Sequence, residues 1–110
     1  MTTKIIKEND FEREVLDSDG ITIARFFGSW CGPCKMQSTI LKQMENEKYN
    51  SIKIVEIDID KSEKLTHKYG IMTVPTLVIF KDGAELEKIA GFRNQKQLEE
   101  IFDNYCDLEK

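Results

Sequence analysis

The pattern of hydrophobic and polar positions changes period along the chain. Residues 21–27, ITIARFF, are apolar at nearly every position, which is typical of a strand buried on both faces. Residues 53–60, KIVEIDID, and 76–80, TLVIF, are rich in β-branched side chains and predict two more strands. A short run at residues 4–7 is a candidate edge strand, and residues 85–91 predict a hairpin partner for 76–80.

Apolar residues recur at helical spacing between and after these strands. Capping-box patterns at Asn9, Asp60 and Asn94 predict three helix starts, because each residue is followed three positions later by Glu or Gln. Gly20 is expected near the end of the helix that starts at Asn9, and Gly70 at the end of the helix that starts at Asp60. A fourth helix, predicted to follow residues 31–34 and to end near Lys48, carries its apolar residues on one side: Met36, Ile40, Leu41 and Met44.

Strands and helices alternate in the order β-α-β-α-β-α-β-β-α, which predicts an α/β fold with about four helices flanking a sheet. We expect a central mixed sheet, mostly parallel, that ends in an antiparallel hairpin turning at residues 81–83, Lys-Asp-Gly. In sheets of this kind, ligand chemistry gathers beyond the carboxyl ends of the strands. Cys31 follows the most apolar strand at that end.

Length and composition limit what the chain can do. Its 110 residues are enough for one domain, which we expect to span 1–110. A net charge of −4, with basic residues scattered among acids, argues against nucleic acid or an anionic membrane as a partner. The chain shows neither a secretory signal nor a run of about 20 apolar residues, so we expect a cytoplasmic location with reduced thiols.

Cys31 and Cys34 form a C-x-x-C at the start of a predicted helix, a pattern that indicates redox chemistry or metal binding. The helix N-terminus favours a thiolate on Cys31. Cys34 lies inside the first turn, where it is shielded from water and should stay protonated longer. Such an asymmetric pair suits disulfide exchange, in which Cys31 attacks a substrate disulfide and Cys34 resolves the mixed disulfide.

Three sequence features together resemble the thioredoxin family over essentially the whole chain. They are Trp30-Cys31-Gly32-Pro33-Cys34-Lys35 after an apolar strand, Val74-Pro75-Thr76 before the hairpin, and Gly91 at the hairpin's end. The resemblance implies the thioredoxin fold and a protein-disulfide reductase that acts on diverse disulfide-containing proteins. It also implies a monomer with no bound cofactor beyond the Cys31–Cys34 dithiol or disulfide. Electrons would then arrive from a separate thioredoxin reductase by the same thiol exchange.

The resemblance further implies a substrate groove beside the cysteines. In the family the proline matching Pro75 is cis, and the backbone of the residue matching Val74 pairs with an extended substrate. The expected apolar rim that receives a partner's disulfide consists of Trp30, Gly32, Pro33, Met72, Thr73, Val74, Gly91 and Phe92. A rim of this kind tolerates many sequences, which is why a general reductase is expected.

Arg25 departs from the family pattern, because thioredoxins usually carry a buried aspartate there, beneath the second cysteine. The usual lysine of the next strand is also replaced, by Glu56, so that acid and base have exchanged strands. One hypothesis is that Arg25 extends to the surface and Glu56 faces solvent. The preferred hypothesis is a partly buried Arg25–Glu56 ion pair near Cys34. Glu56 then becomes the candidate proton acceptor for Cys34, and Arg25 modulates the redox potential with a sign that depends on which charge lies closer.

Other functions stay open at this point. A Cys3His zinc site is one alternative, although structural zinc sites usually have a second close pair of ligands; its nominal ligands are Cys31, Cys34, Cys106 and His67. A non-catalytic binding module could use the same rim, although both cysteines of the pair are retained. Cys106 is interpreted as a partly buried hydrophobe, with a regulatory thiol as the alternative, and His67 as a surface residue of a helix.

Overall fold

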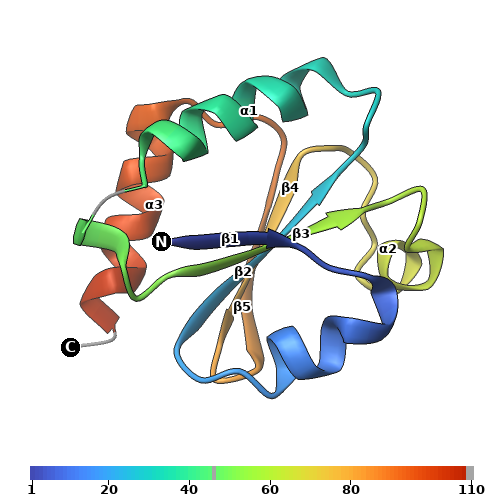
Figure 1. Cartoon of the computed structure of the whole chain (residues 1–110), viewed down its shortest axis with the longest axis horizontal. Helices are drawn as coiled ribbons and strands as arrows, with labels where there is room; N and C mark the ends of the chain where they lie inside the picture. Colours follow the sequence, from blue (N-terminus) through green and yellow to red (C-terminus); the bar gives the residue numbers. More distant parts are fainter. Residues whose placement is uncertain (46, 109–110) are drawn as a thin grey trace.

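The computed structural model describes residues 1–45 and 47–108, and its core is a five-stranded mixed sheet (Figure 1). The strands are β1 (Thr2–Ile5), β2 (Ile21–Phe27), β3 (Lys53–Asp58), β4 (Thr76–Lys81) and β5 (Ala84–Ala90). Their order in the sheet is β1-β3-β2-β4-β5. In the described residues β1 and β2 are parallel to β3, whereas β4 runs antiparallel to β2 and β5. The predicted α/β fold with a mixed sheet is therefore confirmed.

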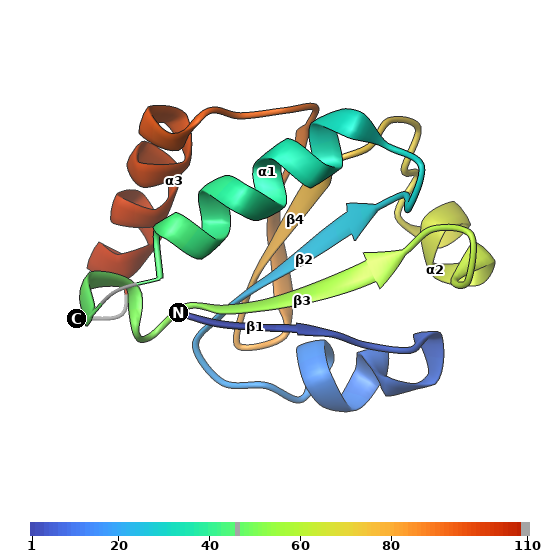
Figure 2. The same ribbon diagram turned by 45° about the horizontal axis from the view of Figure 1, so that its top comes forward.

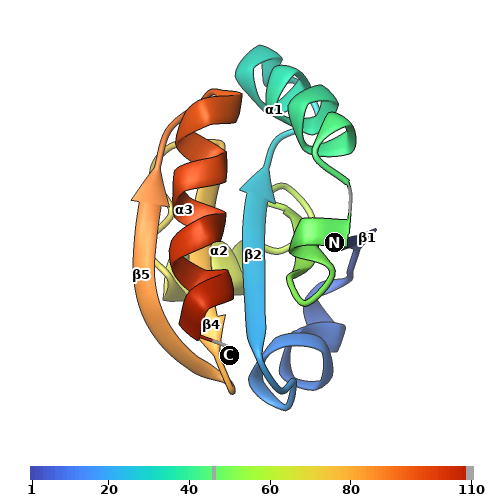
Figure 3. The ribbon, with the colours of Figure 1, turned by 90° about the vertical axis from the view of Figure 1, so that its left-hand side faces the viewer.

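Helices cover both faces of the sheet. α1 (Gly32–Gln43) and α3 (Gln95–Leu108) lie on one face, and α2 (Glu63–Lys68) lies on the other with the turns at 8–10 and 12–16 (Figure 1, Figure 2). Each face has its own hydrophobic cluster, because the side chains of the strands alternate between the two. α1 begins just beyond the carboxyl end of β2, so the cysteine pair lies at that end as predicted (Figure 3).

The N-terminal segment differs from the prediction. β1 begins and ends two residues earlier than the expected strand at 4–7. The helix expected from Asn9 is replaced by a 3-10 turn and a π-type turn, and the Lys7 N–H donates to the Asp10 carboxylate at 3.3 Å. Phe11 and Val15 are nevertheless buried, as their spacing predicts. The two short turns therefore bury both side chains without a regular α-helix.

Glu14 holds this segment to the edge of the sheet. Its carboxylate lies 2.7 Å from Lys4 Nζ of β1 and 2.9 Å from Lys53 Nζ of β3. Hydrogen bonds from Lys4 and Lys53 hold the pKa of Glu14 at about 2, well below its usual range. The carboxylate therefore keeps its charge, and both contacts, at all but strongly acidic pH.

Two helix boundaries also differ from the prediction. α1 ends before Lys48, because continuing its buried stripe would place Lys48 in the core, and Tyr49 is buried there instead. α2 is capped from another part of the chain rather than by the box expected at Asp60. The N–H of Leu65, in the first turn of α2, donates to the Glu8 carboxylate at 2.9 Å.

The third capping box and the hairpin are confirmed. Asn94 and Gln97 exchange side-chain to backbone hydrogen bonds of 2.9 Å at the start of α3. The β4–β5 hairpin turns through Asp82 and Gly83, whose φ angles of 50° and 82° suit a two-residue hairpin loop. Only glycine fits at position 83, since a Cβ there would lie 2.1 Å from the backbone oxygen of Leu16.

Candidate active site

The cysteine pair lies between β2 and α1. Cys31 caps the N-terminus of α1, and the Cys34 N–H donates to the Cys31 Sγ at 3.1 Å. A disulfide joins the two residues, whose Cα atoms are 5.3 Å apart, and both are buried. Pro33 lies in the first turn of the helix, where its missing N–H removes no hydrogen bond. The end of a buried strand and the start of a helix thus position the pair together.

The segment around Pro75 lies against this pair. The Val74–Pro75 peptide bond is cis, as the family resemblance implies. The backbone oxygen of Val74 is 3.6 Å from the Cys31 Sγ, and the Gly91 N–H donates to the Pro75 oxygen at 2.8 Å. The φ of Gly91 is 91°, a conformation that favours glycine. Of the predicted groove residues, Val74 therefore contacts Cys31 directly, and Gly91 is hydrogen-bonded to the adjacent Pro75.

Large hydrophobic side chains are exposed beside the pair. Trp30 is 64% exposed and Met72 is 97% exposed. The Trp30 Nε1 donates to the Asp60 carboxylate at 2.9 Å, and the ring lies so close to Gly28 that a Cβ there would come within 2.8 Å of it. A hollow of about 230 Å³ is lined by Trp30, Ile59, Ile71, Met72, Thr73 and Val74. Apolar groups exposed in one place indicate a surface that binds other molecules.

The remaining predicted rim residues are accessible to different degrees. Gly32 and Pro33 are exposed, whereas Gly91 and Phe92 are half-buried. Sequence reasoning missed Ile59, Asp60 and Ile71, which line the hollow or orient the Trp30 ring. Ile59 and Asp60 directly follow β3, so their position at the carboxyl end of a strand was the available signal.

Arg25 lies beneath α1. Because side chains of β2 alternate, Arg25 shares the face of Ile21 and Ile23, which is the face that α1 covers. Only 1% of the residue is exposed, so the hypothesis that it extends to the surface is wrong. The guanidinium instead donates to three internal acceptors: Nη1 to the Glu56 carboxylate, Nη2 to the Cys34 backbone oxygen, and Nε to the Gln37 Oε1 at 2.7 Å. It also lies over the Phe27 ring, 5.8 Å from the ring centroid.

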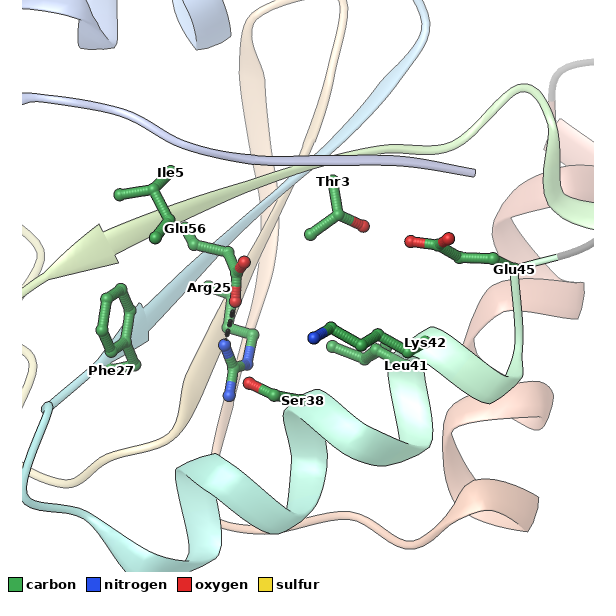
Figure 4. Close-up of a pocket in the computed structure, with 9 residues that line it drawn as sticks. All are labelled: Thr3, Ile5, Arg25, Phe27, Ser38, Leu41, Lys42, Glu45 and Glu56. Atoms are coloured by element: carbon green, nitrogen blue, oxygen red, sulfur yellow. Dashed lines mark hydrogen bonds and ion pairs between the residues drawn. The ribbon is translucent and has the colours of Figure 1, made fainter.

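Glu56 is directly opposite Arg25 in the register of β2 and β3. Its side chain is 17% exposed and borders a cavity of about 280 Å³ (Figure 4). The cavity is lined by Thr3, Ile5, Arg25, Phe27, Ser38, Leu41, Lys42, Glu45 and Glu56. Burial lowers the pKa of the Arg25 guanidinium, and the Glu56 carboxylate opposes that shift. The preferred hypothesis of a partly buried ion pair is confirmed.

Gln37 was missed by sequence reasoning. It is fully buried in α1, and its side-chain oxygen accepts the hydrogen bond from Arg25. The available signal was its position three residues after Cys34, on the stripe of α1 that faces the sheet. A polar side chain on such a stripe needs an internal partner, because buried polar groups are almost always hydrogen-bonded.

The nominal zinc ligands are not brought together. Cys31 and Cys34 are bonded to each other, exposed His67 lies on α2, and half-buried Cys106 lies on α3, on the opposite face of the sheet. The Cys106 Sγ is 3.8 Å from the backbone oxygen of Lys48. Within residues 1–45 and 47–108, no group of three or more His, Cys, Asp or Glu side chains could hold a metal ion.

Comparison with known proteins decides the family. The thioredoxin family model matches residues 2–104. The chain belongs to the thioredoxin family. The thioredoxin of Bacillus subtilis is 37% identical over 101 residues, which cover 92% of this chain and 97% of the relative. The thioredoxin of Listeria monocytogenes is 36% identical over 102 residues, which cover 93% of this chain and 97% of the relative.

Solved structures share the thioredoxin fold. A mutant thioredoxin from Halobacterium salinarum gives a TM-score of 0.83 at 26% identity, over 96% of this chain and 91% of that one. Membership of the thioredoxin family and the bonded Cys31–Cys34 pair make this chain a thiol–disulfide oxidoreductase. Among the helices in the described ranges, none has the length and apolar character needed to cross a membrane.

Proposed function

We propose that this oxidoreductase is a general reductase of protein disulfides, active as a single-domain monomer in the cytoplasm and re-reduced by a thioredoxin reductase. The observation that carries the proposal is the Cys31–Cys34 disulfide at the N-terminus of α1, beside exposed apolar side chains. The cysteine pair itself takes up and gives back two electrons, so the reaction needs no bound cofactor.

The unequal surroundings of the two cysteines support different roles. Cys31 contacts the Val74 backbone on the side of the groove, whereas the backbone of Cys34 contacts Arg25 in the interior. The Cys31 thiolate attacks a substrate disulfide, and one substrate sulfur leaves as a thiolate that takes up a proton. Cys34 then loses its proton and attacks Cys31. The Cys31–Cys34 bond forms, the bond from Cys31 to the substrate breaks, and the second substrate sulfur leaves reduced.

The groove supports recognition of extended protein segments. The backbone of Val74, next to Pro75, can pair with a substrate strand, so part of the affinity comes from main-chain hydrogen bonds that every sequence offers. The surrounding residues add apolar area and open backbone rather than a deep pocket, and this suits many substrates. These residues are Trp30, Gly32, Pro33, Met72, Thr73, Gly91 and Phe92.

Glu56 is the proposed proton acceptor for Cys34, and Arg25 connects the two residues. One edge of the guanidinium contacts the Glu56 carboxylate, and another contacts the Cys34 backbone. Of the two charges, the cation is therefore the one that touches Cys34, and it favours the thiolate over the thiol. Stabilising the dithiol form in this way makes the couple more oxidising than the ~−270 mV typical of thioredoxin.

Reduction of insulin by dithiothreitol tests this function. The wild-type chain should accelerate it, and Cys31→Ser and Cys34→Ser should not. Cys34→Ser should accumulate as a mixed disulfide with its substrate, because the resolving thiol is missing. Cys106→Ser is the matched control and should keep the wild-type rate, since Cys106 lies on α3 and outside the disulfide.

A wild-type chain that binds disulfide-containing partners without accelerating insulin reduction would instead be the non-catalytic binding module. Replacing dithiothreitol by a thioredoxin reductase with its own reductant tests the electron supply. If the reductase leaves the Cys31–Cys34 disulfide intact while dithiothreitol reduces it, that part of the proposal fails.

A further inference from the structure

Gln37 has a donor group that the folded disulfide form leaves unused. Its side chain is completely buried, and its Oε1 accepts the hydrogen bond from the Arg25 Nε at 2.7 Å. Its Nε2 is also buried and has no hydrogen-bond partner in the part of the chain that the structure describes. A buried amide nitrogen without an acceptor is unfavourable, so a role in another state of the protein would explain its presence.

Arg25 fixes which way the Gln37 amide faces. A guanidinium has only donor groups, so the Gln37 side chain must present its oxygen to Arg25 and turn its NH₂ group elsewhere. The donor groups of Arg25 therefore determine which of the two amide atoms of Gln37, oxygen or nitrogen, faces the guanidinium. Because Arg25 is itself held by Glu56 and by the Cys34 backbone oxygen, the amide is anchored on one side.

Cys34 and Gln37 lie on the same side of α1. Residues three positions apart in a helix are neighbours on its surface, and both of these residues face the sheet. Their exposed fractions are 2% for Cys34 and 0% for Gln37. Arg25 contacts both, through Nη2 and Nε of one rigid guanidinium. The unused NH₂ group therefore belongs to a buried side chain one helical turn from Cys34, and Arg25 joins the two residues.

We propose that Gln37 is a positioning residue that donates its free N–H to the Cys34 sulfur in the dithiol form. The inference rests on the proposed role of Cys34 as the resolving thiol. In the disulfide the Cys34 sulfur is uncharged and bonded to Cys31, and it is a weak acceptor. When two electrons from a dithiol reductant break that bond, the sulfur becomes a thiol or thiolate. A thiolate is a strong, charged acceptor for a nearby amide.

This hydrogen bond acts on the second step of disulfide reduction. In the mixed disulfide, Cys34 loses its proton to Glu56 or to water, and its thiolate attacks the Cys31 sulfur. Gln37 stabilises that thiolate and orients it, while the attack of Cys31 on substrate does not involve Gln37. The titratable groups around Cys34 include Cys31, Arg25, Lys35, which lines the same hollow as Cys34 and Arg25, and, through Arg25, Glu56.

The most direct test uses the wild-type chain and nuclear magnetic resonance. The side-chain NH₂ signals of Gln37 should shift between the disulfide and dithiol forms. In the dithiol form they should titrate with the same midpoint as the Cβ signal of Cys34. The side-chain amide of Gln43, exposed at the other end of α1, is the internal control and should not follow Cys34. Gln37 signals that stay constant through both changes would overturn the proposal.

Two variants then measure the effect on chemistry. Gln37→Glu keeps an acceptor for Arg25 but removes the donor, and Gln37→Met removes the donor without adding charge. In both, the Cys34 midpoint should rise by about one pH unit, as expected when a thiolate loses one charge-assisted hydrogen bond. Resolution of a peptide mixed disulfide should slow only about threefold, because a thiolate of higher pKa is intrinsically more nucleophilic. Formation of the mixed disulfide by Cys31 should be unchanged.

Gln43→Glu is the matched control for the added charge and should leave both steps at wild-type rates. A raised Cys34 midpoint in Gln37→Glu together with a wild-type midpoint in Gln37→Met would show a charge effect alone and overturn the proposal. The titrations need no substrate. They therefore test the Gln37 contact even if the chain fails to accelerate insulin reduction, and the two failures can be distinguished.

Discussion

Removing the Glu56 carboxylate leaves the buried charge of Arg25 without its anionic partner. The guanidinium is 1% exposed, and in a Glu56→Ala variant it would keep two neutral acceptors, on Gln37 and on the Cys34 backbone. Breaking a buried ion pair typically destabilises a protein by about 3–5 kcal/mol. Because the Glu56 side chain is 17% exposed, water can replace part of its contact. We therefore expect the lower end of that range, about 3 kcal/mol in the free energy of unfolding.

Urea unfolding measures this loss. With a slope of about 1–3 kcal/mol per M, a loss of about 3 kcal/mol lowers the midpoint by about 1–3 M. Glu85→Ala is the matched control, because Glu85 is a glutamate of β5 whose side chain is exposed. Its effect should stay within about 0.5 kcal/mol.

Arg25→Met completes a double-mutant cycle with Glu56→Ala. Both substitutions remove the same ion pair. The free energy of unfolding lost in the double variant should therefore be about 2 kcal/mol smaller than the sum of the two single losses. The reasoning would be refuted by two losses that add to within about 0.5 kcal/mol, because the residues would then act independently.

Two further predictions concern the scaffold. Because the folded state lowers the pKa of Glu14 from 4.5 to about 2, its stabilising effect is complete above the higher value and is lost as pH falls toward the lower one. Glu14→Gln should flatten the dependence of urea midpoints on pH in that window, and an unchanged dependence would contradict the assignment. Gly83→Ala should destabilise by more than about 1 kcal/mol, since alanine at positive φ is strained and its Cβ meets backbone. Gly32→Ala is its control, with open space around the new Cβ and a change expected below about 0.5 kcal/mol; equal losses in the two would refute the explanation.

Features set by neighbouring residues were predictable from the sequence. The apolar runs that became β2, β3 and β4 are buried in the sheet, and the Asn94–Gln97 box forms because both partners lie within one turn. The two-residue hairpin at Asp82-Gly83 is encoded in the same local way. The family resemblance correctly implied the cis bond before Pro75.

Features that depend on distant contacts were not predictable. The cap of α2 comes from Glu8, which lies 57 residues before Leu65 in the chain and accepts a hydrogen bond from the Leu65 N–H. A capping-box pattern records only local possibilities, so nothing near Asp60 indicated that cap. In the same way, Gln37 becomes part of the site only because β2 brings Arg25 beneath α1. The pairing of Arg25 with Glu56 could be inferred because the family pattern shows two exchanged charges in adjacent strands.

The redox equilibrium of the Cys31–Cys34 couple with glutathione tests most directly whether Arg25 tunes the pair. The proposed role of Arg25, whose guanidinium contacts the Cys34 backbone, predicts a wild-type potential less negative than ~−270 mV, because a cation beside a thiolate stabilises the dithiol form of a couple. Arg25→Met should make the potential more negative. A wild-type potential at or below that value, unchanged in Arg25→Met, would contradict this account.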